Sequence, residues 1–352
     1  MKKNKIHKLE IKRYKGLILI LILFIMSFYV QFIFGYKYSD QNLDFIELPP
    51  IVKIRYISPD AGIYIHKDLY PVLFNKKGEL IGLLKQIKTG LKKDIYLFDN
   101  DELIVDCSDV KDFKNIDYDK IKIIYKNKNI DKFTNKLVWN KTYIFGTDRL
   151  GRDIFLRVFQ GIKISLIVGF TASVVNLFIG VVYGSVAGYV GGKIDIIMLN
   201  FLNVINSIPS ILLVILLSLF VPPGIWSIII IIGLVYWVSM ARQVRAGVMA
   251  LKRRDFILAE ILIGTPQYKI IFKHILPNMK ETILTILIVN IQNAVFTETF
   301  LSFLGIGLPA PIASLGTLIN DSITNFRSSP SQLIIPSLAI LLVLICFQSQ
   351  TE

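Results

Sequence analysis

The sequence predicts an all-α polytopic membrane protein with six transmembrane helices and a small β-rich extracytoplasmic insert. Hydrophobic residues make up 53% of the 352 residues, and the mean hydropathy is +0.56. Several apolar runs approach the roughly 20 residues needed to cross about 30 Å of hydrocarbon. Much of the net charge of +14 stands beside these runs, where Lys and Arg act as topology signals. We therefore expect contact with membrane lipid and none with nucleic acid.

The N-terminal part of the chain predicts a membrane anchor. Residues 1–15 are basic, and residues 16–34 form the first apolar run. This run is too long for the core of a signal peptide, and no small-residue cleavage site follows it. Because positive charge favours the inner side of a membrane, we expect the N-terminus in the cytoplasm.

Residues 35–142 form a polar region in which acidic and basic residues nearly balance. The short apolar stretches DIYLFD, ELIVDC and KIKIIYK are typical of strands. Turn signals at residues 75–78 (NKKG) and 99–101 (DND) favour hairpins. We expect a β-rich insert outside the cytoplasm. A loosely ordered spacer is the alternative, because Lys, Asn and Asp are abundant.

Residues 143–352 form a helical core with five further predicted spans. These spans are apolar, and they cover approximately residues 164–190, 198–221, 225–240, 283–303 and 333–347. Six crossings from an inner N-terminus place the loop 241–281 and the C-terminus in the cytoplasm. Because the last span is short and the chain ends soon after it, a truncated copy with reduced function is an alternative.

A basic segment stands before the second span, on the side predicted to be external. It contains Arg149, Arg152, Arg157 and Lys163, which Asp148 and Asp153 partly offset. We expect a short amphipathic helix in the membrane interface, with Arg157 reaching lipid headgroups. Its apolar face would consist of Ile154, Phe155, Val158 and Phe159.

The loop 241–281 predicts two short helices joined at a Gly-Thr-Pro corner. Phe256, Ala259, Glu260 and Ile263 share one face of the first helix. Gly264 suits a left-handed helix end, and the Thr and Pro that follow suit the start of a second helix. A compact basic knob on the cytoplasmic side is typical of a docking element for a soluble partner.

Polar residues within the spans are candidates for a pathway or for packing. Asn200, Asn203 and Asn206 recur at helical spacing in the third span, which favours a helix interface over a pore lining. Glu298 in the fifth span is an ionisable group at membrane depth, and packing and a pathway-facing role are equally open. His274 has no nearby His or Cys, so no metal site is expected.

A membrane-anchored enzyme or sensor that acts through the insert is the rival class. His66 has no nucleophile beside it in the sequence, and Cys107 has no evident His partner. We therefore expect no catalytic residue in this chain.

Several motifs in a fixed order resemble one known family. They are residues 145–153 (FGTDRLGRD), 191–195 (GGKID), Ile208-Pro209, the loop 255–278, 301–305 (LSFLG) and 314–317 (SLGT). Together they resemble the peptide/nickel family of ABC importer permeases, and above all the C-type subunit of oligopeptide permeases. The resemblance covers about residues 143–347 and the first span, but not the insert.

The resemblance implies a type I ABC importer permease fold in a bacterial inner membrane and a role in oligopeptide import. A homologous second permease, two cytoplasmic ATP-binding subunits and an extracytoplasmic substrate-binding protein would be its partners. The chain has no GxxxxGK[ST] motif, so its partners would use ATP and the chain itself would need no cofactor. Dipeptides, nickel chelates and peptide-like antibiotics are alternative substrates.

The resemblance also assigns the knob its role as the element that couples to the ATPase. Residues 255–264 match the family's coupling helix, so Phe256 and Ala259 would enter a groove on the ATPase, with Arg253 or Glu260 at its rim. The remaining matched positions are Asp255 and Gly264, and His274, Leu276 and Pro277 at the HxLP end. The family often has Glu where this chain has Leu258, so Glu260 would serve instead. The Gly-Asp-x-Leu-Arg-Asp tail usual in the family is also missing.

Overall fold

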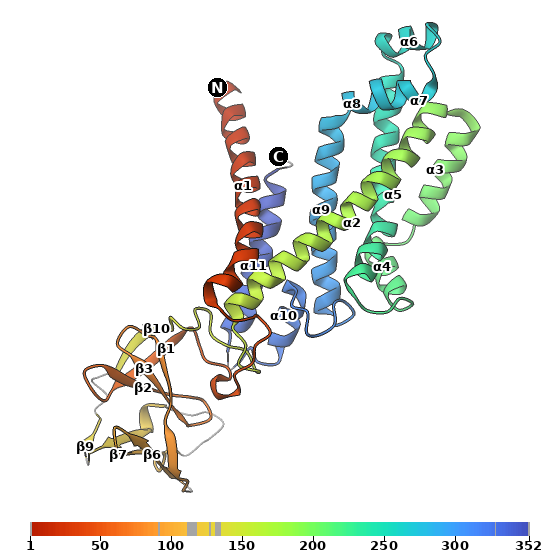
Figure 1. Ribbon diagram of the computed structural model, residues 1–352. Coiled ribbons are helices and arrows are strands. Elements are labelled where there is room, and N and C mark those ends of the chain that lie inside the picture. Colours follow the sequence, from red (N-terminus) through yellow and green to blue (C-terminus); the bar gives the residue numbers. More distant parts are fainter. Residues whose placement is uncertain are drawn as a thin grey trace. The chain divides into compact units, whose positions relative to one another are not determined.

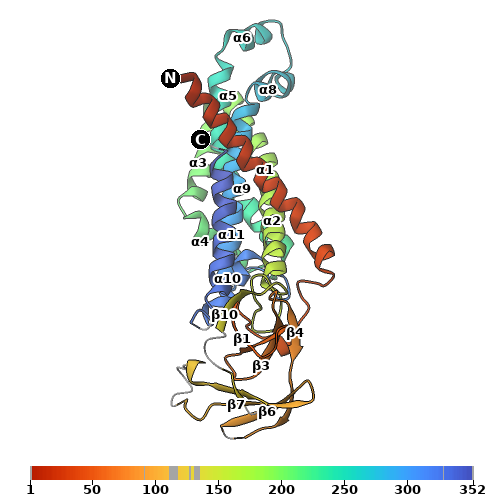
Figure 2. The same cartoon turned by 90° about the vertical axis from the view of Figure 1, so that its left-hand side faces the viewer.

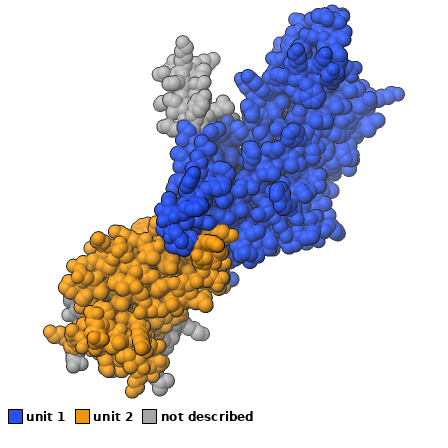
Figure 3. Space-filling view, in the orientation of Figure 1, with its two compact units in different colours: residues 1–36, 156–324, 333–352 blue, residues 37–155, 325–332 orange. Residues whose placement is uncertain are grey.

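The computed structural model describes residues 2–90, 92–110, 118–126, 128–130, 135–327 and 329–350, and of residues 2–15, 119 and 135 only the backbone (Figure 1). The chain divides into two compact units (Figure 3). Unit 1 holds residues 1–36, 156–324 and 333–352, and unit 2 holds residues 37–155 and 325–332. The last two residues of the short C-terminus lie outside the described part.

Unit 2 contains two antiparallel five-stranded sheets. The first has the order β10-β1-β2-β3-β4, with β1 Ile51–Tyr56, β2 Ala61–Ile65, β3 Pro71–Asn75, β4 Leu80–Leu83 and β10 Asn135–Trp139. The second has the order β5-β6-β7-β8-β9, with β5 Lys85–Lys88, β6 Lys93–Phe98, β7 Asp101–Asp106, β8 Lys122–Tyr125 and β9 Lys128–Asn129. Strands β6, β7 and β8 fall on the three apolar stretches noted in the sequence.

Strands β2 and β3 of the first sheet are buried on both faces. Ile63 and Leu73 on one face share an apolar cluster with Leu103 and Ile123 of the second sheet. The opposite face belongs to a second cluster, formed by Leu48, Val52, Ile54, Val72 and Phe74. Unit 2 therefore has a core of its own, built from strands in which apolar residues occupy both sides.

Unit 1 is helical, and five helices in the described part of the chain are long and apolar enough to cross a membrane. These are α1 Lys2–Phe34, of which residues 16–34 are the apolar part, α2 Ile154–Val190, α5 Ile225–Lys252, α9 Lys280–Phe303 and α11 Ser331–Gln348. Two shorter helices, α3 Gly192–Asn206 and α4 Ser210–Ser218, pass the same test only together and meet at an angle of 73°. A further helix, α10 Leu315–Ile323, follows α9.

The prediction of a separate interfacial helix before the second span is wrong. Helix α2 runs without a break from Ile154 to Val190, so the segment expected to lie flat is its first two turns. Arg157 does not reach outward, because its side chain is buried and pairs with Asp321 of α10 at 3.3 Å. An arginine paired at a helix end satisfies its charge without lipid headgroups.

Close packing of α2 on α5 depends on three glycines one turn apart. A Cβ atom added at Gly180, Gly184 or Gly188 would lie 2.4–2.7 Å from atoms of α5. Small residues at this spacing let two helix backbones approach closely. The α2–α5 pair is therefore the compact part of unit 1 and supports the segments that follow α5.

Candidate functional site

The loop between α5 and α9 folds into a knob that projects beyond the ends of these two helices (Figures 1 and 2). We define the knob as residues 253–279. It contains α6 Asp255–Leu262, α7 Gln267–Lys269, a π-helical turn Ile270–Ile275 and α8 Leu276–Asn278.

The corner of the knob is a Schellman motif. Gly264 has φ of +85°, a conformation that costs an L residue about 1–2 kcal/mol. The amide of Thr265 donates to the carbonyl of Glu260 at 3.1 Å, and the amide of Gly264 donates to that of Ile261 at 3.1 Å. These two bonds satisfy carbonyl groups that the end of α6 would leave unpaired.

The inner face of the knob is held by apolar packing. Ile257 is fully buried and clusters with Ile270 and Ile275 of the π-helical turn and with Val248 of α5. Burying such a side chain contributes roughly 1.5–3 kcal/mol. Sequence reasoning missed Ile257, because it selected the opposite face of the same helix. The knob is thus attached to the bundle by its inner face.

The outer face of α6 is apolar and exposed. Phe256, Leu258 and Ala259 are exposed along the helix, and Leu262 and Ile263 at its end are 88% and 79% exposed. Contiguous apolar side chains on a surface mark an interaction site. Arg253 and Asp255 are exposed at the start of α6, where they border this apolar surface.

Glu260 is engaged inside the knob. Its carboxylate accepts a hydrogen bond from Thr265 Oγ1 at 2.6 Å and lies 3.7 Å from His274 Nε2. Asn278 Nδ2 donates to the carbonyl of His274 at 2.6 Å. These contacts brace α6 against the segment that ends in Leu276 and Pro277, so Glu260 and His274 both act on the knob's own geometry.

A pair of arginines fixes α3 against α5, and sequence reasoning did not find them. Arg245 makes a bidentate ion pair with Asp195, at 2.5 and 2.6 Å. One turn earlier, Arg242 Nη2 donates to Asn203 Oδ1 at 2.9 Å. One feature of the sequence could have indicated this ion pair. Asp195 of the GGKID motif is an acidic residue beside a membrane span, and such a residue needs a basic partner.

Glu298, the other polar candidate, is fully buried within unit 1. Its carboxyl group accepts hydrogen bonds from Ser165 Oγ at 2.6 Å and Ser302 Oγ at 2.9 Å. The first of these bonds joins α9 to α2. The arrangement favours packing over a pathway-facing role.

The FGTDRLGRD segment is a tight loop inside unit 2. One carboxylate oxygen of Asp148 accepts the amides of Leu150 and Arg152, both at 2.9 Å, and the other accepts Arg152 Nε at 2.7 Å. Asp153 Oδ1 accepts the amide of Phe155 at 2.7 Å, which caps the start of α2. The carboxylates of both aspartates are thus engaged in hydrogen bonds within the loop and at the start of α2, which fits a structural role for the motif.

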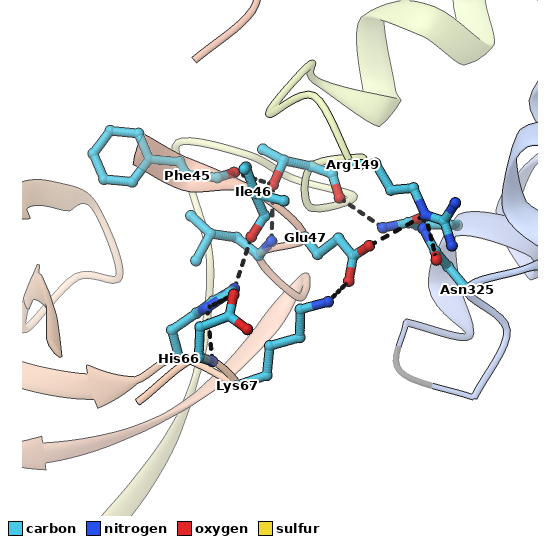
Figure 4. Close-up of polar contacts among 11 residues, drawn as sticks. Phe45, Ile46, Glu47, His66, Lys67, Arg149 and Asn325 are labelled. Atoms are coloured by element: carbon cyan, nitrogen blue, oxygen red, sulfur yellow. Dashed lines mark hydrogen bonds and ion pairs between the residues drawn. The ribbon is translucent and has the colours of Figure 1, made fainter. Parts of the chain in front are cut away.

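Buried Glu47 connects this loop to the rest of unit 2 (Figure 4). Its carboxylate pairs with Lys67 and lies 3.6 Å from Arg149 Nε. Arg149 also donates to the side chain of Asn325. A shared carboxylate thus ties three segments of unit 2 together.

A family model and a solved structure each match part of this chain. The family described as "Binding-protein-dependent transport system inner membrane component" matches residues 180–351. The solved structure of the MetNI methionine ABC transporter in an inward-facing form covers 55% of this chain and 93% of that chain, at 15% identity and a TM-score of 0.46.

Three curated relatives carry permease names. The chain is 40% identical over 225 residues to the oligopeptide transport system permease protein OppC of Bacillus subtilis, covering 64% of this chain and 71% of that protein. It is 42% identical to the dipeptide permease DppC of Lactococcus lactis, covering 58% of this chain and 60% of that protein. It is 39% identical to OppC of Escherichia coli, covering 58% of this chain and 68% of that protein. The chain is therefore a multi-pass membrane protein that belongs to the family of binding-protein-dependent ABC importer permeases, as a transport subunit and not an ATPase.

Proposed function

We propose that this chain is the C-type permease subunit of an oligopeptide importer. A homologous second permease would complete the path, two cytoplasmic ATP-binding subunits would use ATP, and an extracytoplasmic protein would deliver the peptide. The chain itself would hold no cofactor. The observation that carries the proposal is the knob, whose inner face is locked onto α5 while its outer face exposes apolar side chains.

The knob would transmit ATP-driven movement to the helices. Phe256 and Ala259 would enter a groove on the ATPase, and Arg253 and Asp255 would lie at its rim. A central apolar contact contributes most of the binding energy of an interface, whereas rim charges contribute less. Gly264 would set the corner, and Glu260, His274, Leu276 and Pro277 would make the knob move as one body.

The proposed topology has six crossings in a type I permease fold, with α3 and α4 together forming one broken span. The N-terminus and the knob would lie in the cytoplasm of a bacterial cell, and the β-rich insert would lie outside. Lys and Arg density in residues 1–15 and in the knob supports this orientation.

Co-purification from the native membrane tests the proposal. We expect the tagged chain to bring down a second permease and ATP-binding subunits, and the reconstituted complex to take up labelled oligopeptides only with ATP and the binding protein. Recovery of the chain alone, in a detergent that preserves other transporters, would contradict the importer assignment.

A dipeptide importer is the second candidate, because a relative named as a dipeptide permease is 42% identical over 205 residues. Competition between dipeptides and longer peptides in the same uptake measurement separates the two.

A further inference from the structure

The break between α3 and α4 exposes polar backbone within a predicted membrane span. Residues 207–209 (Ser-Ile-Pro) separate the two helices, these three residues and Asn206 before them are exposed, and the chain turns there by 73°. At 1.5 Å per residue, the break at residue 207 lies about 14 Å from residue 198, where the predicted span begins. That position lies well inside about 30 Å of hydrocarbon.

Pro209 is the reason that the helix cannot continue. It has no amide hydrogen, and its ring disfavours helical conformation in the residue before it. The amides of Ser207 and Ile208 only close short turns, to Val204 at 3.3 Å and Ile205 at 3.4 Å. The carbonyl of Pro209 accepts the amides of Leu212 and Leu213 of α4, at 3.0 and 3.1 Å, whereas no described backbone amide donates to the carbonyl of Ser207 or Ile208, which lie outside the helical hydrogen-bond ladder.

Lipid is an unsuitable neighbour for this break. In hydrocarbon, each unsatisfied backbone polar group costs several kcal/mol, so irregular backbone at membrane depth is tolerated only where protein covers it or water reaches it. Helix α4 differs sharply, because its exposed residues Leu212 and Leu216 are apolar and suit a lipid or protein neighbour.

Hydrogen-bonding side chains accompany the exposed backbone. Asn203 and Asn206 are exposed at the end of α3. Exposed Ser207 follows them, and its hydroxyl donates to the carbonyl of Val204 at 2.6 Å. Asn203 is held by Arg242, and the Arg245 ion pair to Asp195 anchors the other end of the same helix. The break thus has a fixed support on α5, and Figure 1 shows α3, α4 and α5 next to one another.

We propose that residues 203–209 line the aqueous part of the translocation path and form passing hydrogen bonds with the backbone amides of the transported peptide. This inference rests on the proposed function for its substrate. Asn amides and free carbonyls match both the donors and the acceptors of a peptide backbone, without selecting any peptide side chain. Weak, unselective contacts of this kind let a substrate enter the path and also leave it.

Thiol labelling tests whether water reaches the break. In a chain whose own cysteines are replaced (Cys107→Ser, Cys346→Ala), we expect Asn206→Cys and Ser207→Cys to react with a charged, membrane-impermeant maleimide in the assembled complex. The matched controls Leu212→Cys and Leu216→Cys should stay unlabelled. Absence of labelling at 206 and 207, with and without a trapped ATP analogue, would show that lipid or the second permease covers the break and would overturn the proposal.

Measurements of peptide uptake distinguish a role of the break in lining the path from a purely structural role. We expect Asn206→Leu to reduce peptide uptake at least tenfold with complex assembly unchanged, and Asn206→Gln to restore most of it. Wild-type uptake by Asn206→Leu would overturn the peptide contact. If the wild-type complex moves no peptide at all, the proposed function fails, while the labelling result still decides whether the break faces water.

Discussion

Ala259 stands at the middle of the exposed apolar face of the knob. The substitution Ala259→Asp places a carboxylate where a groove on the ATPase would exclude water. Burying an unpaired charge costs several kcal/mol, and about 3 kcal/mol corresponds to a loss of affinity of more than 100-fold. We expect the ATP-binding subunits to be lost on co-purification, while the permease still inserts into the membrane.

Gln267→Asp is the matched control, because Gln267 is exposed but belongs to α7 and not to α6. This variant should keep its ATP-binding subunits. Equal loss in both variants would mean that added negative charge, and not the apolar contact, weakens docking.

His66 makes the stability of unit 2 depend on pH. Its side chain is fully buried, and Nε2 donates to the carbonyl of Ile46 at 2.7 Å (Figure 4). Nδ1 accepts the amide of Asp68 at 3.2 Å. Burial lowers the pKa of His66 below its usual 6.5, although Asp68 acts in the opposite direction. The unfolded chain therefore binds the proton more readily than the folded chain does.

The direction in which stability changes with pH follows from the difference in proton binding between the folded and unfolded chain. Stability is full above pH 6.5 and falls as the pH drops from 6.5 towards the lowered pKa, because there the unfolded state holds more protons. We expect hydrogen exchange of β2 and β3 in the intact chain to accelerate at pH 5.5 relative to pH 7.5, after correction for intrinsic rates. His66→Asn should be less stable at pH 7.5 and should lose most of this additional acceleration, and persistence of the full effect would assign it to other groups.

Between elements, the Asp195–Arg245 pair holds α3 on α5. Removing one partner of a largely buried ion pair costs about 3 kcal/mol or more, because the other charge is left unpaired. We expect Asp195→Asn and Arg245→Gln each to lower the thermal unfolding temperature. The double variant should lose less stability than the sum of the losses in the two single variants. A coupling energy of about 2 kcal/mol in the double-mutant cycle checks this, and strictly additive losses would contradict it.

Local signals predicted local features well. The Gly264 corner followed from a Gly-Thr-Pro run whose residues each have one favoured conformation. The third predicted span, residues 198–221, shows the opposite case. Its hydropathy is continuous, but hydropathy carries no information on backbone direction, and the structure bends at Pro209. Pro209 is a local signal for a helix break, but a span prediction based on hydropathy gives it no weight.

Contacts between distant residues could not be predicted from one sequence. Asp195 and Arg245 are separated by 50 positions, and no pattern at that spacing identifies an ion pair. Ile257 was missed for a related reason. The face Phe256, Ala259, Glu260 and Ile263 has the correct helical spacing, yet burial is decided by the π-helical turn that folds over Ile257. Spacing defines a face, and only the fold shows which face is covered.

At the scale of the whole molecule, the path of the chain decides where the knob lies. If α3 and α4 together cross the membrane, the knob and the β-rich insert lie on opposite sides. If α3 and α4 form a re-entrant loop, the number of crossings falls by one and both lie on the same side.

Epitope accessibility distinguishes these outcomes. We expect a tag inserted between the exposed residues Lys76 and Lys77 to be accessible from outside intact cells, and a tag after Pro266 to be accessible only after permeabilisation. External accessibility of both tags would favour the re-entrant arrangement over six crossings.

The pairing of β1 with β10 also bears on how this protein could have changed through time. The first and last strands of the insert lie side by side, with Ile51 opposite Trp139, so the polypeptide enters and leaves that domain within about 5 Å. The insert lies outside residues 180–351, which the family model matches. A domain whose two ends coincide can be acquired, enlarged or exchanged for another without altering the spacing of the helices that flank it in the sequence.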